Sequence, residues 1–496
     1  MKEKAWPVIY QEDAYKIHPH IESWIDRMDK DLKSFEDIAK ELYLPTESII
    51  HAISCRLFDL GEINRSTKVI KYGLDQYPDP ILHSQYLRCL MALPGVKKQQ
   101  FAEENLKWAE LYGKGTNAFP EELLKDRDTS KNKKLIVGFL CCYTQTELCR
   151  TAIAPTLRSL KQHNIHVVIF SIGNIGEDWL TSSVHECVNI IIPNEKLLSE
   201  LILEKKIDIL VDLNGRFRTD NPINVILKKS APVIVSYGNM LGTYGLDTVK
   251  YMLADHYAVP PGDEKYYTEN IFRFESGDAG TFEIPDTTIN QLPYLKNKFI
   301  TFGSFNALLK INNDVLETWL EILNRIPNSK LFIKAANLDS AFFKKRILYF
   351  LTKYKVHTSR IVLEKYSKFN DMLMKYNNID IALNTFPYSG GTTIAYALWM
   401  GLPSITLEPK DDSMVSGGAA GVVRSPGFDD FVVSSKEEYI EKAVELSRKP
   451  EYLSEIRRTM RDRLKKTARF NPELFGQDFA KQLRAIWHHW LDNSQK

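Results

Sequence analysis

The chain has 496 residues, of which 44% are hydrophobic, and 65 Lys and Arg side chains nearly balance 63 Asp and Glu. This composition is that of a folded globular protein, and it excludes disordered, collagen-like and small disulfide-scaffold classes. A chain of this length usually divides into about three domains. The formal net charge is only +2 and no block of five or more like charges occurs. A nucleic-acid partner is therefore not expected.

The cysteines and the apolar runs predict a cytoplasmic location. The six cysteines include no CxxC pair, which is typical of reduced thiols. The N-terminal residues lack an apolar stretch of signal-peptide length, and no window of 18 or more apolar residues occurs. We therefore expect neither a membrane span nor a secretory signal.

Residues 1–125 show apolar side chains at three- and four-residue spacing, which predicts helices. The segment 59–80 looks like one helical hairpin of tetratricopeptide (TPR) type, but no second copy follows in register. Since stacked repeats normally need three or more copies, we interpret this region as a TPR-like helical cap rather than a solenoid. A polar, charged run at 125–134 marks its end.

Short β-branched apolar runs then alternate with helical stretches, first over residues 133–285 and again over 297–470. Runs that are apolar on both faces suit parallel sheets covered by helices. The predicted fold class is α/β, with two Rossmann-like domains facing a cleft. Residues 471–496 predict a C-terminal helix that packs back on the body through one apolar face, formed by Phe475, Phe479, Leu483, Ile486, Trp487 and Trp490.

The best candidate for an anion site lies in residues 379–408, where a strand runs into the turn SGGTT and a helix follows. Gly390 and Gly391 would let backbone N–H groups approach a ligand. Thr392 and Thr393 fall in the first helical turn, whose free N–H groups and positive dipole end favour a diphosphate. A tight strand-to-helix turn without a ligand explains the pattern equally well. Neither a P-loop nor a GxGxxG dinucleotide motif is present.

Several segments in sequence order resemble glycosyltransferase family 41. They are FPYSGGTT with ALWMGLPSITL, FGSFNALLKINNDVLETWLEILNRIPNSKLFIK, and VDLNGRFRTDNP followed by APVIVSY and LGT. The family includes nucleocytoplasmic protein O-GlcNAc transferases, plant protein O-fucosyltransferases and bacterial cytosolic N-glucosyltransferases of adhesins. The resemblance extends from about residue 80 to the C-terminus, and it implies the GT-B architecture, in which a sugar nucleotide binds mainly to the second domain.

The resemblance also implies roles for individual residues of the second domain. Asn306 and Lys310 match the donor-site motif, in which the lysine neutralises the diphosphate leaving group. A fixed ammonium stabilises the charge that develops on that group in the transition state. The turn formed by residues 390–393 matches the family's phosphate and sugar contact. An ordinary surface lysine at a strand-to-helix turn is the alternative for Lys310.

Two acidic residues of the first domain are candidates for the acceptor side. Asp212 and Gly215 in DLNG match a family motif at the end of a strand, where the carboxylate either orients or deprotonates an acceptor or caps the following turn. Glu147 lies in the loop after the first strand, close to where relatives carry a histidine. It is either an acceptor-side base or a solvated loop residue.

The chain departs from the family pattern at four further positions. Met372 and Tyr396 replace a histidine and an aspartate that help O-GlcNAc transferases to hold the uridine and ribose. The usual motif LDTFPY reads LNTFPY here, so Asn384 replaces its aspartate. Ser416 stands in place of an arginine. These departures bear on which donor is used and on activity itself.

The resemblance therefore implies an inverting glycosyltransferase that moves a hexose or N-acetylhexosamine from a nucleotide-diphosphate donor, with UDP as the expected nucleotide. The acceptor is a Ser, Thr or Asn side chain of a protein or peptide, such as a bacterial adhesin or flagellin. No metal or other cofactor is expected. A catalytically impaired relative that binds acceptors or supports a partner is the alternative.

Overall fold

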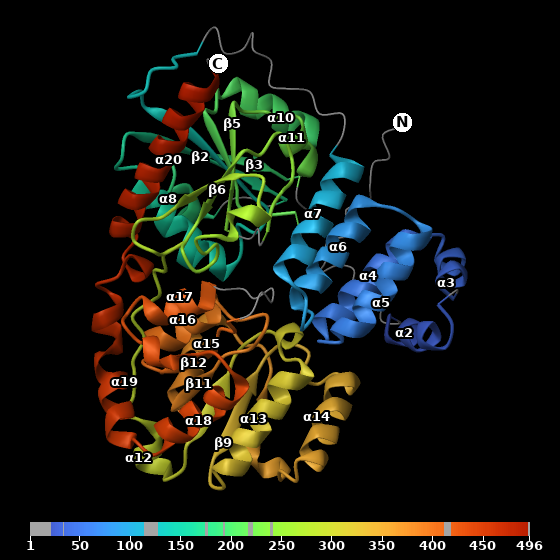
Figure 1. Cartoon of the computed structure of the whole chain (residues 1–496), viewed down its shortest axis with the longest axis vertical. Helices are drawn as coiled ribbons and strands as arrows, with labels where there is room; N and C mark the ends of the chain where they lie inside the picture. The colour runs from blue at the N-terminus through green and yellow to red at the C-terminus, as the bar shows by residue number, and fades with distance from the viewer. Residues whose placement is uncertain are drawn as a thin grey trace.

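The computed structural model describes residues 21–32, 34–113, 127–173, 177–191, 194–216, 222–238, 242–410 and 418–494. A helical region and two α/β domains follow one another along the chain, and Figure 1 shows the two sheets one above the other with the helical region beside them. The position of Ser416 lies outside the described residues. Within them, no helix is both long and apolar enough to cross a membrane.

The N-terminal region is entirely helical. Its helices are α2 (Ile21–Lys30), α3 (Ser34–Leu42), α4 (Thr46–Asp59), α5 (Ile63–Gln76), α6 (Pro80–Ala92) and α7 (Lys98–Tyr112). Asp79 begins α6, because its Oδ1 accepts hydrogen bonds from the N–H groups of Ile81 and Leu82 at 2.8 and 3.1 Å. Segment 59–80 is one helix with a turn at each end, so its interpretation as a complete hairpin was wrong. Helix α5 packs on both α4 and α6, so each helical hairpin consists of two successive helices.

The first domain contains a fully parallel sheet in the order β3-β2-β1-β4-β5-β6-β7. Its strands are β1 (Leu135–Cys141), β2 (Ile165–Ile172), β3 (Glu186–Ile190), β4 (Ile209–Asp212), β5 (Val233–Tyr237), β6 (Tyr251–Ala254) and β7 (Asn270–Arg273). Strands β1, β4 and β5 are buried on both faces, as the apolar runs indicated. Strands β6 and β7 have only four residues each, and the sequence analysis predicted neither of them.

Short helices and the C-terminal helix cover this sheet. They are η2 (Cys149–Ile153), α8 (Ala154–Leu160), α9 (Asp178–Thr181), α10 (Glu195–Glu204), α11 (Ile223–Leu227), η3 (Asp263–Tyr266) and α20 (Pro472–Ser494). Helix α20 lies against α8, where a Cβ on Gly476 would come within 2.0 Å of Ser159 Oγ. The apolar face of α20 joins the core of the first domain through Phe475, Phe479, Leu483, Ile486 and Trp487.

The second domain contains a six-stranded parallel sheet in the order β10-β9-β8-β11-β12-β13. Its strands are β8 (Thr301–Ser304), β9 (Lys330–Lys334), β10 (Ile361–Glu364), β11 (Ile381–Leu383), β12 (Ser404–Leu407) and β13 (Val432–Val433). The two sheets and the preceding helical region confirm the predicted fold class.

The helices of the second domain lie on both sides of its sheet (Figure 1). They are α12 (Pro293–Asn297), η4 (Leu308–Lys310), α13 (Asn313–Arg325), α14 (Ala341–Lys353), η5 (Thr358–Arg360), α15 (Phe369–Lys375), η6 (Tyr376–Asn378), α16 (Thr392–Trp399), α17 (Gly418–Arg424), η7 (Asp429–Phe431), α18 (Lys436–Ser447), α19 (Pro450–Leu464) and η8 (Ala468–Phe470). Helices α19 and α20 run along one side of the molecule and connect the second domain back to the first.

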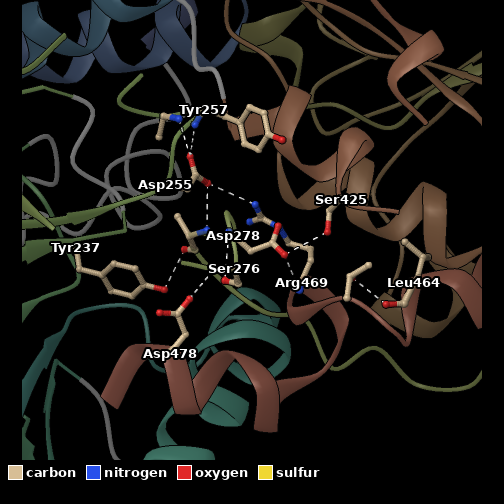
Figure 2. Close-up of polar contacts among 12 residues, drawn as sticks. Tyr237, Asp255, Tyr257, Ser276, Asp278, Ser425, Leu464, Arg469 and Asp478 are labelled. Atoms are coloured by element: carbon tan, nitrogen blue, oxygen red, sulfur yellow. Dashed lines mark hydrogen bonds and ion pairs between the residues drawn. The ribbon is translucent and has the colours of Figure 1, made fainter. Parts of the chain in front are cut away.

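A buried ionic cluster joins the two α/β domains (Figure 2). The Arg469 Nε atom donates to Asp278 Oδ1 at 2.9 Å, and its Nη2 lies 3.4 Å from Asp255 Oδ2. Ser425, which directly follows α17, donates to Asp278 Oδ2 at 3.1 Å. Because the three charged side chains are at most 5% exposed, this cluster positions the domains where the chain crosses between them.

Candidate functional site

The SGGTT turn connects the carboxyl end of β11, near the middle of the second sheet, to helix α16. Gly391 is the residue that precedes the first turn of the helix, so Thr392 and Thr393 occupy that turn as predicted. Carboxyl ends of parallel strands and starts of helices both favour ligand binding in α/β folds. The turn therefore has the location expected of an anion site.

Two glycines of this turn have different surroundings. A Cβ on Gly390 would stand 2.0 Å from Asn306 Oδ1, whereas a Cβ on Gly391 would meet no atom within 4 Å. Gly390 also donates its backbone N–H to Asn384 Oδ1 at 2.8 Å. Gly390 is therefore required by close packing, and Gly391 faces open space.

Asn306 lies beneath the turn and has an unused acceptor. Its side chain is 1% exposed, and its Nδ2 donates to Ser304 Oγ at 3.2 Å. Its Oδ1 atom has no hydrogen-bond partner. A buried carbonyl oxygen without a partner carries a desolvation cost that a hydroxyl or N–H donor of a ligand would remove.

Lys310 approaches the same turn from η4, after strand β8. Its Nζ donates to the carbonyl oxygen of Ser389 at 3.0 Å and lies 4.3 Å from the centre of the Tyr388 ring. Burial lowers the pKa of Lys310 to about 8, because desolvation disfavours the charged ammonium. An anion bound beside Nζ would restore the preference for the charged form.

Asn384 organises the turn, a role that the sequence did not reveal. Its Oδ1 accepts the N–H groups of Thr385 and Gly390, and its Nδ2 donates to Thr406 Oγ1 at 3.3 Å. An aspartate, as is usual in the family, lacks the N–H donor that reaches Thr406. The only sequence signal for this role was the position of Asn384 five residues before Ser389, where the turn begins.

Asp212 ends strand β4 and is enclosed by its own domain. Its carboxylate accepts the backbone N–H groups of Asn214 and Gly215, the side-chain amide of Asn214 and the Tyr244 hydroxyl. The side chain is 2% exposed. Burial raises its pKa, and these hydrogen bonds oppose that rise. The contacts favour the turn-capping interpretation of Asp212 over that of an acceptor base.

Glu147 is the first residue of the helical segment that follows β1 and leads into η2, so its placement in a loop was wrong, and its side chain is partly exposed. Its carboxylate forms an ion pair with Arg150 at 2.8 Å, and the Arg150 guanidinium lies 5.5 Å from the Phe369 ring of the second domain. Its backbone oxygen accepts from Thr151 Oγ1 at 2.6 Å. Glu147 therefore lies beside the junction of the two domains, with a carboxylate that solvent can reach.

Tyr396 contacts the first domain from helix α16. Its hydroxyl lies 3.0 Å from Thr151 Oγ1, and its ring meets the Phe369 ring edge-on at 5.2 Å. Burial raises the pKa of Tyr396 to about 12. This aromatic side chain links the helix that starts at the SGGTT turn to the helical segment that begins at Glu147. Met372 of α15 packs against the core of the second domain.

The structure therefore brings Lys310, Asn306 and Gly390 together through the turn after β11. Asp212 and Glu147 instead bind partners of the first domain. Among the described residues, no group of three or more His, Cys, Asp or Glu side chains could hold a metal ion.

Comparison with known proteins finds a similarity to one family over part of the chain. Residues 273–479, which include the SGGTT turn and Lys310, match the model of Glycosyl transferase family 41. This match covers less than half of the chain, from the end of β7 into α20. The O-GlcNAc transferase of Thermobaculum terrenum, solved with one lysine replaced by methionine, shares its fold with a TM-score of 0.81. That similarity has 25% identity and covers 90% of this chain and 85% of the other.

Two plant proteins are similar in sequence, and both carry the name "Probable UDP-N-acetylglucosamine--peptide N-acetylglucosaminyltransferase SPINDLY". The protein of Petunia hybrida is 28% identical over 377 residues, which cover 74% of this chain and 40% of the relative. The protein of Arabidopsis thaliana is 31% identical over 296 residues, covering 59% and 32%. The chain thus spans less than half the length of these relatives.

Proposed function

We propose that this protein is an inverting glycosyltransferase that moves a sugar from a nucleotide-diphosphate donor to a protein or peptide side chain. The observation that carries the proposal is the convergence of the Lys310 ammonium, the unpartnered Asn306 Oδ1 and the start of α16 around Gly390. A cation, an acceptor for ligand hydroxyls and free helical N–H groups are the groups that a sugar diphosphate requires.

In this proposal the acceptor attacks the sugar carbon in a single displacement while the diphosphate leaves from the opposite side. Lys310 and the first turn of α16 stabilise the negative charge that grows on the leaving diphosphate. The Lys310 ammonium is already held by the Ser389 carbonyl, so little reorganisation is needed during the reaction. Because these groups supply the stabilisation, the scheme requires no metal.

For the donor we propose a UDP-linked hexose or N-acetylhexosamine. The support is that several relatives of this family are named for UDP-N-acetylglucosamine. Tyr396 and Met372 replace residues that contact uridine and ribose in O-GlcNAc transferases, so these two side chains should determine how this chain differs in donor preference.

For the acceptor we propose a Ser, Thr or Asn side chain, with an adhesin or flagellin as the first proteins to examine. Glu147 is the stronger candidate for the acceptor-side base, because its carboxylate is partly exposed whereas that of Asp212 is enclosed. Glu147→Gln should lower kcat and leave nucleotide affinity unchanged. An equal loss of both, or no loss, would reject Glu147 as the base.

Nucleotide binding and transfer are tested separately. UDP at 100 times its Kd should stabilise the protein by about 2.7 kcal/mol, measured by thermal unfolding with GDP as the comparison. Mass spectrometry of proteins from cells with and without the gene should then find a hexose or N-acetylhexosamine that depends on it. Absence of binding by any nucleotide would overturn the proposed function.

The second candidate is a catalytically impaired relative that binds acceptors or supports a partner. Met372, Asn384 and Tyr396 stand where the family usually has other residues, and these replacements favour the impaired relative. Nucleotide binding without any gene-dependent modification, in vitro or in cells, would support this candidate over the transferase.

A further inference from the structure

The segment that carries Lys310 packs against the helical region. Leu309, its neighbour in η4, and Tyr388, which directly precedes Ser389, both pack against the apolar core of the helical region, although both belong to the second domain. Helix α4 also contacts η4. The Lys310 Nζ atom lies 4.3 Å from the centre of the Tyr388 ring. The helical region therefore touches both chain segments that meet at Lys310, which are η4 and the start of the SGGTT turn.

The turn between α4 and α5 approaches η4 with its backbone. Gly61 in this turn has a φ of +76°, a left-handed conformation that favours glycine. A Cβ on Gly61 would stand 2.8 Å from the carbonyl oxygen of Leu308, the first residue of η4. Any larger residue at this position would push the two backbones apart. The helical region and η4 are thus in direct backbone contact.

Arg346 of α14 joins the same two backbones. Its Nη1 donates to the carbonyl oxygen of Gly61 and its Nη2 to that of Ile311, both at 2.9 Å. The side chain is 11% exposed, and a carboxylate oxygen of Glu62 lies 3.8 Å from Nη1. The planar guanidinium presents its donors in a fixed fork, so it sets the spacing between Gly61 and Ile311. Because Ile311 directly follows Lys310, this bridge ends next to the lysine.

The η4 turn depends on contacts from outside it. It is a 3-10 turn of three residues, in which the Lys310 N–H donates to the Ala307 carbonyl oxygen at 2.9 Å and the Ile311 N–H donates to that of Leu308 at 3.0 Å. A turn this short is unstable by itself in water, because its hydrogen bonds do not offset the entropy cost of fixing the backbone. External contacts therefore determine where the backbone of Lys310 lies.

We propose that Arg346 is a positioning residue for Lys310, on which it acts by holding η4 against the turn between α4 and α5. The inference rests on the proposed function for the role of Lys310, but the hold on η4 can be measured without a nucleotide. The alternative is that Arg346 only attaches the helical region to the second domain. In that case its loss would lower stability and leave the affinity for a diphosphate unchanged.

Hydrogen exchange of the full chain tests the hold on η4. In Arg346→Met, the amide hydrogens of Lys310 and Ile311 should exchange at least about tenfold faster than in the unaltered protein, because their hydrogen bonds then open more often. Asn337→Gly is the matched control. It removes the hydrogen bond that Arg56 Nη1 of α4 donates at 3.1 Å to the segment after β9 instead of to η4, and glycine tolerates the positive φ of 62° at this position. The control should change the exchange of the two amides less than about twofold.

A double-mutant cycle tests whether Arg346 acts through Lys310. Isothermal titration of Arg346→Met should give a Kd for UDP about tenfold higher than in the unaltered protein, because a displaced ammonium loses its contact with the diphosphate. The Kd for uridine, which lacks the diphosphate, should change less than about twofold. In Lys310→Met, the additional Arg346→Met should change the Kd for UDP less than about twofold, because the group that Arg346 positions is already absent. Asn337→Gly should leave both Kd values unchanged.

A second variant covers the case in which Arg346→Met does not fold, as thermal unfolding would show. Arg346→Lys keeps the charge but lacks the planar fork that reaches two carbonyl oxygens at once. It should lie between the unaltered protein and Arg346→Met in the exchange of η4 and in the Kd for UDP. Where Arg346→Met does not fold, Arg346→Lys takes its place in the cycle.

Faster exchange in η4, together with a loss of UDP affinity that Lys310→Met removes, supports the proposal. Unchanged exchange, equal losses for UDP and uridine, or a full loss that persists in Lys310→Met would overturn it and leave Arg346 as an attachment between the two regions. Equal effects of Asn337→Gly and Arg346→Met would overturn it as well. Failure of the unaltered chain to bind any nucleotide would contradict the proposed function, whereas the exchange result would still decide whether Arg346 holds η4.

Discussion

The carboxyl ends of β4 and β11 use buried polar residues in opposite ways. At the end of β4, Asp212 accepts four hydrogen bonds from its own domain. Beside the turn after β11, the Oδ1 atom of Asn306, a residue that follows β8, has no partner, and Lys310 Nζ donates to a single carbonyl oxygen at 3.0 Å. A carboxylate whose acceptors are filled stabilises a turn, whereas an unused acceptor beside a cation is suited to a ligand.

The largest effect is expected for Lys310→Ala. The variant should fold, but kcat should fall by two orders of magnitude or more, which corresponds to about 3 kcal/mol of lost transition-state stabilisation. Steady-state kinetics with a sugar nucleotide and a peptide acceptor measures it. Turnover within tenfold of the unaltered enzyme would remove Lys310 from the mechanism and weaken the contrast between the two strand ends.

The two glycines of the turn should respond differently to the same added methyl group. Gly390→Ala forces a Cβ against Asn306 Oδ1 and should cost about 2 kcal/mol of unfolding free energy. Gly391→Ala meets open space and should stay within about 0.5 kcal/mol. Urea unfolding compares them, and similar losses would contradict the close packing of Gly390.

The affinity for the donor should depend on the charge of Lys310. Its pKa is about 8 in the folded chain, against an ordinary value near 10.4. A diphosphate binds the protonated form, so the Kd for UDP should rise about tenfold between pH 7 and pH 9, which is about 1.4 kcal/mol. Isothermal titration at both pH values measures the change. Lys310→Met should abolish most of this pH dependence.

The same lowered pKa affects stability with a defined sign. Between pH 8 and about 10.5 the unfolded chain binds more protons at this lysine than the folded chain does. The Lys310 contribution to the unfolding free energy should therefore rise with pH across that window. Lys310→Met should remove this rise, as followed by thermal unfolding. A contribution that falls with pH would show that the ammonium is stabilised rather than desolvated.

The smallest effect is expected at the enclosed strand end. Asp212→Asn places an amide N–H group next to groups that themselves donate hydrogen bonds, so one of these bonds is lost. The variant should therefore lower the unfolding free energy by about 1 kcal/mol. Affinity for UDP should not change, because Asp212 bonds only within the first domain through its four hydrogen bonds. A hundredfold loss of kcat with unchanged stability would instead restore Asp212 as a reacting group.

Periodicity alone predicted most elements, because both faces of central parallel strands are apolar and helices place apolar residues on one side. Thus β1, β4 and α20 were expected from their own residues. The two-residue strand β13 and the four-residue strands β6 and β7 were not. Short strands have too few residues to show a pattern, and their pairing with neighbouring strands determines them.

The sequence by itself determined the fold class and the turn after β11, and it predicted a role for Lys310, because each rests on neighbouring residues. Tertiary structure decided which polar atoms remain available. The side chain of Asn306 reaches Gly390 only when β8 and β11 are paired, and Asp212 meets Tyr244 only across the first domain. Hydrogen-bond satisfaction depends on atoms far apart in the chain, so no local pattern could distinguish the filled carboxylate from the unused amide.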